Sequence, residues 1–321
     1  MEIKDYTNAQ EAVRDYGGKA GKKISIYDEG HIWMLKFPQN VKNIERINVS
    51  YTNSPVSEYI GSHIYETLGL PVHETKLGIY NDKIVVLCKD FTVNPNRELK
   101  PIENILNIPL DKNLESFRSE SKSSTDTHGE DLGELVSTFK YNTKISPEFE
   151  KRFWEMFVVD AVIGNNDRHN RNWGYFIENN ERILAPVYDN GNSFLGKKSD
   201  EEIKELSPDK YNSILSSGNT PFIYKDKKVD AFRVIKNQYL GDERKPIPAL
   251  QKAIITITER FQKNKNKIED LIDSIPEQKN GIIIITPERK ELYKKLIQDR
   301  YMKFLKPIYT KIKENSKSYS L

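Results

Sequence analysis

The feature that most constrains this chain is a polar loop followed closely by an acidic turn. Residues 164–173 read Gly-Asn-Asn-Asp-Arg-His-Asn-Arg-Asn-Trp, and residues 186–191 read Pro-Val-Tyr-Asp-Asn-Gly. The loop supplies Asp167 and then Asn172, and the turn supplies Asp189. Phosphoryl transfer needs this order of groups: a carboxylate for the acceptor hydroxyl, then an amide and a second carboxylate for magnesium. The sequence therefore predicts a phosphoryl-transfer site.

The segment that follows the loop supports the interpretation of the spacing between Asp167 and Asn172. Asp167 and Asn172 alone form an Asp-x4-Asn pattern, which arises by chance in many proteins. Here the apolar residues 183–187 lead directly into Asp189, as a strand that ends at a second metal ligand would. The loop and the turn together favour Asp167 as the base and Asn172 with Asp189 as the metal ligands.

Two further side chains of the loop, Arg168 and His169, invite a role in the chemistry. Imidazole can orient a carboxylate or bind a metal, and a guanidinium group can donate two hydrogen bonds to a phosphate. We expect His169 to contact the nucleotide or to orient Asp167, whereas Arg168 either contacts phosphate or pins the loop. The five histidines show no zinc-type spacing such as His-Glu-x-x-His, which disfavours a zinc enzyme.

The first third of the chain reads as strands around one helix. Residues 23–37 predict a hairpin with its turn at residues 28–30, which places Lys36 near the end of the second strand. Strand-like runs return at residues 75–80 and 83–88 around a second turn. The predicted order is strand, strand, helix, strand, strand.

The predicted helix covers residues 54–68. Ser54 is the expected N-cap, Pro55 takes the first helical position and Gly69 ends the helix. Glu58 lies in its first turn. Apolar side chains recur at helical spacing, at Val56, Ile60, Ile64 and Leu68.

Lys36 and Glu58 form an expected ion pair. In kinase active sites, a strand lysine holds the α- and β-phosphates and a helix carboxylate holds that lysine, and both occur together with a polar loop of this kind. The segment Lys89-Asp90-Phe91 leaves the last predicted strand. We expect residues 88–91 to be a hinge whose backbone reads adenine.

A glycine- and lysine-rich segment precedes the hairpin. Small residues let backbone amides approach phosphates, and lysines add positive charge. The segment lacks the hydroxyl that follows the lysine of a P-loop, so a kinase-type loop is favoured over a P-loop. The residues expected to bind ATP here are Gly17, Gly18, Gly21, Lys22 and Lys23.

The predicted domain organisation has three parts. Residues 1–91 form a β-rich N-lobe, residues 92–145 an insertion, and residues 146–321 a helical C-lobe, so the fold class is α+β and two-lobed. Residues 116–138 offer little to bury and are predicted to be a flexible segment. Regular structure is expected to resume at Ser146, which caps a helix leading to the polar loop.

The rest of the C-lobe is expected to be helical. Residues 248–275 and 287–304 read as helices, the second opened by Thr286-Pro287-Glu288.

Composition limits the cellular compartments and the classes of binding partner that can be expected. The single cysteine, Cys88, has no second cysteine with which to form an internal disulfide, and the N-terminal residues lack a signal-peptide core, so we expect a reducing cytosol. No apolar run reaches the roughly 18 residues of a membrane span, so no membrane role is expected. The net charge of +3 does not favour nucleic acid, although residues 251–321 carry a local excess of positive charge.

At this point the chain resembles the HipA-like family of serine/threonine kinases. The resemblance rests on Gly-Asn-Asn-Asp-Arg-His-x-x-Asn-Trp-Gly, on Ala-Pro-Val-Tyr-Asp, and on Lys36-Phe37-Pro38, Ser57-Glu58 and Lys89-Asp90-Phe91, in order over about residues 16–195. Met-Leu-Lys-Phe-Pro, Ser-Tyr-Thr-Asn and Cys-Lys-Asp-Phe-Thr look closest to the compact CtkA-type members.

The resemblance implies a protein-kinase-like fold, ATP and Mg2+ as cofactors, and protein serine or threonine residues as acceptors. It assigns Asp167 as the base, Asn172 and Asp189 as metal ligands, Lys36 to phosphate and residues 89–91 to the hinge. Toxin members phosphorylate aminoacyl-tRNA synthetases under the control of a DNA-binding antitoxin. The CtkA-type members are linked instead to host signalling proteins and to secretion by a non-classical route.

Two features depart from the larger members of that family. Those members carry an extra N-terminal subdomain for partner contacts, and we expect no room for one before Tyr16, which argues against an antitoxin bound in that way. Their regulatory serine has no counterpart between Tyr16 and Lys23. Ser25, between two isoleucines, reads as a strand residue.

Two alternatives stay open from the sequence. Phosphoinositide-type lipid kinases share the Asp-Arg-His-x-x-Asn loop, but here Asp189 is followed by Asn-Gly rather than Phe-Gly. The other alternative is an inactive kinase fold that binds a partner or nucleic acid through its basic C-terminal region. The joint presence of Lys36, Asp167, Asn172 and Asp189 argues against it, because a binding module needs none of them.

Overall fold

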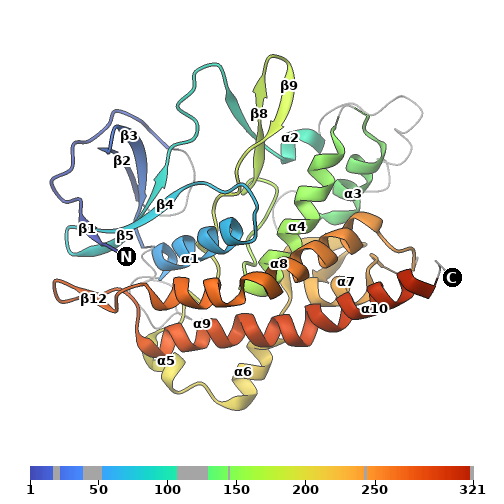
Figure 1. The fold of residues 1–321 in the computed structure, drawn as a ribbon. Helices are drawn as coiled ribbons and strands as arrows, with labels where there is room; N and C mark the ends of the chain where they lie inside the picture. Colours follow the sequence, from blue (N-terminus) through green and yellow to red (C-terminus); the bar gives the residue numbers. More distant parts are fainter. Residues whose placement is uncertain (17–21, 39–52, 107–128, 144, 242–243, 319–321) are drawn as a thin grey trace. The chain divides into compact units, whose positions relative to one another are not determined.

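The structure is a computed structural model, drawn as a ribbon in Figure 1. Its residues divide into two compact units. The description covers residues 1–16, 22–38, 53–106, 129–143, 145–241 and 244–318. The first unit comprises residues 1–95, 186–213 and 264–297, and the second comprises residues 96–185, 214–263 and 298–321. The division into residues 1–91, 92–145 and 146–321 remains a prediction.

The first unit is built on a five-stranded sheet in the order β1-β4-β5-β3-β2. Helix α1 (Ser54–Thr67) packs beside β4 and β5 (Figure 1). The strands are β1 (Lys4–Asp5), β2 (Lys23–Asp28), β3 (His31–Lys36), β4 (Thr75–Tyr80) and β5 (Lys83–Lys89). Except for the short β1, which pairs parallel with β4, neighbouring strands run antiparallel. The predicted hairpins and strand order are confirmed.

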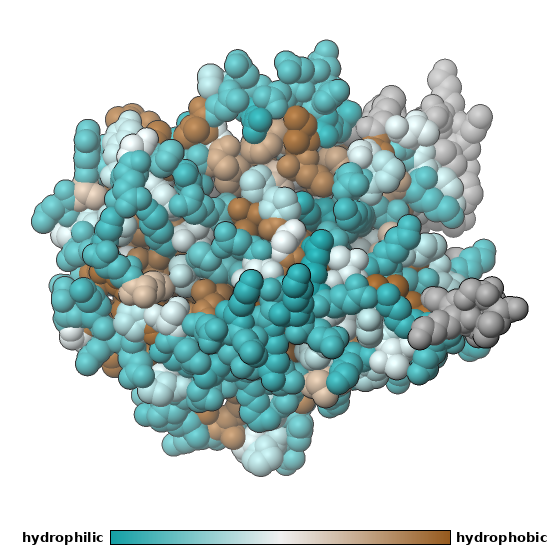
Figure 2. All heavy atoms as spheres, viewed as in Figure 1, coloured by the Kyte–Doolittle hydropathy of each residue, from teal (hydrophilic) through white to brown (hydrophobic). Residues whose placement is uncertain are grey.

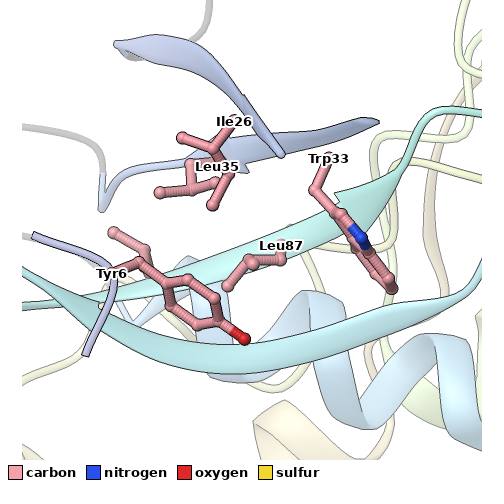
Figure 3. Packing of buried hydrophobic residues seen from close by; sticks show 6 residues of the cluster. Tyr6, Ile26, Trp33, Leu35 and Leu87 are labelled. Atoms are coloured by element: carbon pink, nitrogen blue, oxygen red, sulfur yellow. The ribbon is translucent and has the colours of Figure 1, made fainter. Parts of the chain in front are cut away.

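One face of this sheet carries an apolar cluster, shown in Figure 3. Alternate residues of a strand point to the same face, so Trp33 and Leu35 of β3 enter the cluster together. The cluster consists of Tyr6, Ile26, Trp33, Leu35, Val85 and Leu87. This packing fixes the register of β3, and with it the position of Lys36 at the end of the strand.

The second unit is mainly helical and carries two three-stranded sheets, β6-β8-β9 and β11-β10-β7. Its helices are α2 (Glu103–Leu106), α3 (Leu132–Tyr141), α4 (Pro147–Ile163), α7 (Ala231–Asn237) and α10 (Lys306–Ser318), with a π-helical turn at Tyr301–Leu305. Its strands are β6 (Glu98–Pro101), β7 (Glu130–Asp131), β8 (Gly174–Glu178), β9 (Glu181–Leu184), β10 (Asn219–Tyr224) and β11 (Lys227–Asp230). The α+β class is confirmed.

Further elements come from the later part of the chain. Helices α6 (Pro208–Leu215), α8 (Pro248–Asp273) and α9 (Pro287–Arg300) contribute residues to both units, while α5 (Asp200–Lys204) and the hairpin β12 (Gln278–Lys279) with β13 (Ile282–Ile283) belong to the first. The two long helices predicted after residue 248 are confirmed, each within a few residues of its predicted end.

Two sequence predictions are wrong in detail. The predicted flexible segment 116–138 is strand β7 and helix α3 from residue 130 onward, while residues 116–128 lie outside the described residues. Buried Leu132 and Leu135 and the capping carboxylate of Asp131 make α3 a stable helix, which the surrounding polar residues concealed in the sequence. Helix α1 is capped by Asn53 rather than Ser54, without a side-chain hydrogen bond.

The face shown in Figure 2 is dominated by hydrophilic side chains. Large apolar residues that are exposed, such as Tyr27, Ile183 and Met302, are distributed among different elements. Within the described part of the chain, no helix combines the length and the apolar character needed to cross a membrane.

Candidate active site

The first unit brings three of the predicted site residues into direct contact. The Lys36 ammonium lies 3.1 Å from Glu58 Oε2 and 3.0 Å from Asp189 Oδ1. Strand β3 supplies the lysine, helix α1 supplies the glutamate, and the turn after residue 186 supplies the aspartate. The Glu58 side chain is 2% exposed, whereas that of Asp189 is 45% exposed. One carboxylate is therefore a buried anchor and the other faces solvent.

The second oxygen of Glu58 is held by groups distant in sequence. Its Oε1 accepts a hydrogen bond from the backbone N–H of Asn190 at 2.9 Å and lies 3.0 Å from His73 Nε2. The same histidine nitrogen lies 3.1 Å from the Ser62 hydroxyl, one helical turn beyond Glu58 on α1. Each oxygen of the glutamate thus has fixed partners, which holds Glu58 in the rotamer that meets Lys36.

The charges of this cluster support one another. Burial works against the charge of Lys36, but Asp189 and Glu58 outweigh it and hold the lysine pKa well above its usual range. Burial alone would raise the pKa of Glu58, yet Lys36 and the hydrogen bond from His73 lower it below its usual range. Lys36 and Glu58 are therefore both charged at neutral pH.

A group of possible metal-ligating atoms lies in the same region. The side chains of Glu58, His73 and Cys88, all buried, offer ligand atoms within 4.8 Å of one another. Glu58 is already bonded to Lys36 and His73, and burial raises the pKa of the Cys88 thiol. We therefore assign Glu58 and His73 to the network around Lys36 rather than to a metal centre, and Cys88 is a buried free thiol.

The second unit holds the polar loop at the end of α4. This helix begins with Ser146 as its N-cap and Pro147 in its first turn, and it ends at Gly164, as the sequence predicts. Gly164 has φ +72°, and a Cβ there would come within 2.6 Å of Arg300 Nη1. That guanidinium group also donates to the Val162 carbonyl at 3.0 Å. The start of the loop at Gly164 is therefore fixed against the Arg300 side chain.

Asp167, His169 and Asn172 lie together in this loop. The Asn172 side-chain amide donates to the Asp167 backbone carbonyl at 2.8 Å, and His169 Nε2 lies 4.0 Å from Asp167 Oδ1. The Asp167 side chain is 53% exposed. The carboxylate is thus accessible to a substrate, while its backbone is fixed from the Asn172 side.

Arg168 pins the loop from inside. Its Nε donates to Asp160 Oδ2 at 2.9 Å, and its Nη1 donates to the Asn172 carbonyl at 2.8 Å. Arg168 and Asp160 are 3% and 5% exposed, and Asn165 also donates to Asp160 Oδ1 at 3.0 Å. The geometry favours a structural role for Arg168 over a phosphate contact.

A second carboxyl group, that of Glu130, lies close to the loop. Its Oε2 accepts a hydrogen bond from the Asn170 backbone N–H at 2.5 Å. Burial raises the pKa of Glu130 to about 7, although the Asn170 N–H and Arg171 oppose the shift. The backbone of the polar loop is therefore bonded to a carboxyl group with a pKa near neutrality.

The predicted hinge residues end β5. The backbone N–H of Lys89 donates to the Glu74 carbonyl at 2.9 Å, and that of Asp90 donates to the Ile32 carbonyl at 2.9 Å. Phe91 lies with its ring 5.8 Å from that of Tyr188. The first unit thus places this hinge segment beside the residue that precedes Asp189.

The Asp90 side chain is occupied by protein partners. Tyr16 donates its hydroxyl to Oδ2 at 2.9 Å, and Arg14 forms an ion pair with the same oxygen. Thr92 donates both its backbone N–H and its hydroxyl to Oδ1 at 2.7 Å. Since the Asp90 N–H already donates to Ile32, a nucleotide contact from this residue would have to use its backbone carbonyl.

Of the glycine-rich segment, Gly17, Gly18 and Gly21 lie outside the described residues. Lys22 lies with its ammonium 5.4 Å from the centre of the Phe37 ring. Lys23 begins β2 opposite Lys36, and burial together with the Lys36 charge lowers the pKa of Lys23. The predicted role of this segment in binding ATP stays a prediction.

Sequence reasoning missed four residues of the site. His73, Asn190, Asp160 and Glu130 are all partly or wholly buried. The first three bond to Glu58 or Arg168, which the sequence did single out, and Glu130 bonds to the backbone of the polar loop at Asn170. Asn190 and Asp160 lie beside or near recognised motifs, which is a weak signal. No local pattern points to His73 or Glu130, because their partners are brought to them by the fold.

These two groups of residues can be compared with known proteins. The HipA-like C-terminal domain family matches residues 16–273. The chain belongs to this family. The serine/threonine-protein kinase CtkA of Helicobacter pylori (strain J99) is 32% identical over 316 residues, which cover 94% of this chain and 86% of that relative. The resemblance to the HipA-like family, and to its CtkA-type members, is confirmed.

Solved structures agree on the fold. The crystal structure of the proinflammatory kinase CtkA of Helicobacter pylori matches with a TM-score of 0.81 and 28% identity, over 98% of this chain and 99% of the other. HipA of Shewanella oneidensis MR-1, solved with HipB and operator DNA, matches with a TM-score of 0.55 and 14% identity, over 93% of this chain and 69% of the other. The fold is therefore kinase-like.

Proposed function

We propose that this chain is an ATP- and magnesium-dependent protein kinase that transfers the γ-phosphoryl group to serine or threonine hydroxyls of proteins, itself included. The observation that carries the proposal is the contact of Lys36 with Glu58 and Asp189, three residues from separate elements, in a member of the HipA-like family. The relative CtkA, named a serine/threonine-protein kinase, supports the same reaction class.

Lys36 is the proposed partner of the α- and β-phosphates. Its ammonium is charged and held at a fixed point by two carboxylates, so little ordering is needed when an anion arrives. Glu58 would keep the lysine in place from the buried side. The Lys89–Phe91 backbone is the proposed adenine contact.

Asp189 and Asn172 are the proposed metal ligands. Carboxylate and amide oxygens suit magnesium, and the Asp189 carboxylate is partly exposed, as a ligand must be. Asn172 uses its amide nitrogen on the Asp167 carbonyl, which leaves its side-chain oxygen as the donor atom for a metal. Bound magnesium would neutralise phosphate charge during transfer.

Asp167 is the proposed base. Its exposed carboxylate can accept the proton of an acceptor hydroxyl, and the bond from Asn172 fixes the backbone that carries it. His169, at 4.0 Å, is placed to orient that carboxylate. Arg168 would act through the loop backbone and not on the substrate.

The test is transfer of label from ATP marked on the γ-phosphate. Purified protein with magnesium should label serine or threonine in a cell lysate, and Asp167→Asn should lower turnover by roughly 100-fold or more while ATP still binds. Asp226→Asn, which changes an exposed aspartate of the same unit, should behave as wild type. Wild-type turnover in Asp167→Asn would exclude Asp167 as the base.

Other outcomes separate the alternatives. Label on phosphoinositides rather than proteins would indicate a lipid kinase. ATP binding without any transfer would indicate an inactive kinase fold, and a salt-sensitive acidic partner would then be expected. Acceptors such as aminoacyl-tRNA synthetases or host signalling proteins, an antitoxin partner, and a cytosolic or secreted location stay predictions from the family resemblance.

A further inference from the structure

We infer that Asn190 is a positioning residue that joins the metal-binding turn to helix α1, so that Lys36, Glu58 and Asp189 are assembled as one unit before nucleotide binds. The inference rests on the proposed function, because it concerns the metal ligand of that site. It assigns a task to the residue that stands where Phe follows the metal-binding aspartate in Asp-Phe-Gly kinases.

Asn190 is bonded to α1 through both its backbone and its side chain. Its backbone N–H donates to Glu58 Oε1 at 2.9 Å, and its Nδ2 donates to the Ser62 hydroxyl at 3.0 Å. Its own carbonyl accepts a hydrogen bond from the Ser193 hydroxyl at 2.8 Å. Asn190 and Ser193 are 0% exposed, so these bonds are not exchanged with water.

The packing at this point is as close as a backbone allows. A Cβ added to Gly61 of α1 would come within 2.9 Å of Asn190 Cβ, a distance that real Cβ atoms do not show. Gly61 therefore lets the turn lie directly on the helix, between the two helix residues to which Asn190 bonds. A displacement of Asn190 cannot occur without breaking these contacts.

Asp189 needs such support because of its backbone. It has φ +63°, a left-handed conformation that costs a non-glycine residue roughly 1 kcal/mol or more. This conformation persists only where neighbours over-determine it, and Asn190 is the adjacent residue with fixed partners. The bonds of Asn190 therefore hold the carboxylate of Asp189 near Lys36.

The buried polar network also includes His73. Its Nε2 lies 3.1 Å from the Ser62 hydroxyl that accepts from Asn190, and 3.0 Å from Glu58 Oε1. Helix α1, the segment at residue 73 and the metal-binding turn thus share one set of hydrogen bonds. In Asp-Phe-Gly kinases an apolar ring packs at this point, whereas here a directional network does the same task.

The experiment compares Asn190→Asp with wild type in metal-dependent nucleotide binding. Aspartate has the same shape but cannot donate to Ser62, and it adds a negative charge beside Glu58. We expect the magnesium concentration needed for half-maximal ATP binding to rise about tenfold, with ATP binding in EDTA unchanged. Transfer at saturating magnesium should recover to within about threefold of wild type.

Two further variants keep the test decisive. Ser62→Ala removes the acceptor of the Asn190 amide and should raise the magnesium requirement by about threefold, which reports on the network even if Asn190→Asp does not fold. Asn81→Asp makes the same change on the exposed β4–β5 turn of the same unit and should leave the magnesium requirement unchanged.

The outcomes distinguish this inference from the proposed function. If Asn190→Asp and Ser62→Ala lower the unfolding temperature but keep the wild-type magnesium requirement, Asn190 is merely structural and the inference is overturned. If they weaken ATP binding equally with and without magnesium, it is overturned as well. If wild-type protein neither binds magnesium-ATP nor transfers phosphate, the proposed function itself fails.

Discussion

The charged groups of the first unit and those of the polar loop in the second are held in opposite ways. Glu58 is buried and Lys36 partly buried, and their partners come from separate parts of the first unit. Asp167 is exposed, and its own backbone is held by a near neighbour in sequence, through the bond from Asn172. We therefore expect the first group to stabilise the fold as well as to serve the proposed reaction, whereas Asp167 should serve the proposed reaction alone.

The largest expected effect separates the two groups directly. Glu58→Ala leaves Lys36, His73 and the Asn190 N–H without their shared acceptor, and breaking a buried ion pair costs roughly 3 to 5 kcal/mol. Asp167→Ala removes an exposed carboxylate and should change the free energy of unfolding by less than about 1 kcal/mol. Urea unfolding of both variants measures the difference. Equal losses of unfolding free energy in the two variants would contradict the difference between the buried and the exposed carboxylate.

A pH-dependent effect is next in size and concerns Glu130. Its pKa is about 7 in the folded protein against an ordinary 4.5, so the folded state holds the proton more tightly between these values. The free energy of unfolding therefore falls as pH rises through this window, and the loss is complete above it. Glu130→Gln removes the charge and should exceed wild type in stability at pH 8 by up to about 3 kcal/mol.

The measurement is urea unfolding of wild type and Glu130→Gln between pH 5 and pH 8. The difference between them should shrink toward the acid end, where the wild-type carboxyl is protonated. Glu181→Gln, at an exposed position of the same unit, should show no such trend. A constant difference across the range would mean that Glu130 does not titrate there.

Two histidines of the first unit give the third comparison. His73 is buried and contacts Glu58 and Ser62, whereas His63 is partly exposed and pairs with Glu66. His73→Gln should lower the free energy of unfolding by roughly 1 to 3 kcal/mol, because buried polar partners lose their geometry. His63→Gln should cost less than about 0.5 kcal/mol. Thermal unfolding measures both losses. A larger loss for His63→Gln than for His73→Gln would contradict the buried network around His73.

The smallest effect tests how the polar loop begins. Gly164 and Gly30 both have positive φ, +72° and +75°, but only at Gly164 would a Cβ meet another group, Arg300. Alanine at either position should cost roughly 1 to 2 kcal/mol for the backbone conformation. Gly164→Ala should cost about 1 kcal/mol more, through the displaced guanidinium. Identical losses in chemical denaturation would show that Arg300 contributes nothing at this point.

Local patterns predicted the elements and most of the named site residues. Ser146 and Pro147 marked the start of α4, and Gly164 marked its end, because capping and backbone conformation depend on neighbours in sequence. Lys36, Glu58, Asp167 and Asp189 were found in the same way, through spacing and order along the chain. The helix α3 was missed because its apolar positions are few and stand among polar residues.

The order of residues along the chain is enough to establish which side chains are available for the chemistry and how they are spaced. Folding adds the bonds of Glu58 to Asn190 and His73, of Asp160 to Arg168, and of Glu130 to Asn170, none of which can be read from the sequence. The physical reason is that the partners of Glu58 and Glu130 are 15 to 132 residues away along the chain. Such pairs leave no local period, since burial and hydrogen bonding join them only after the elements have packed.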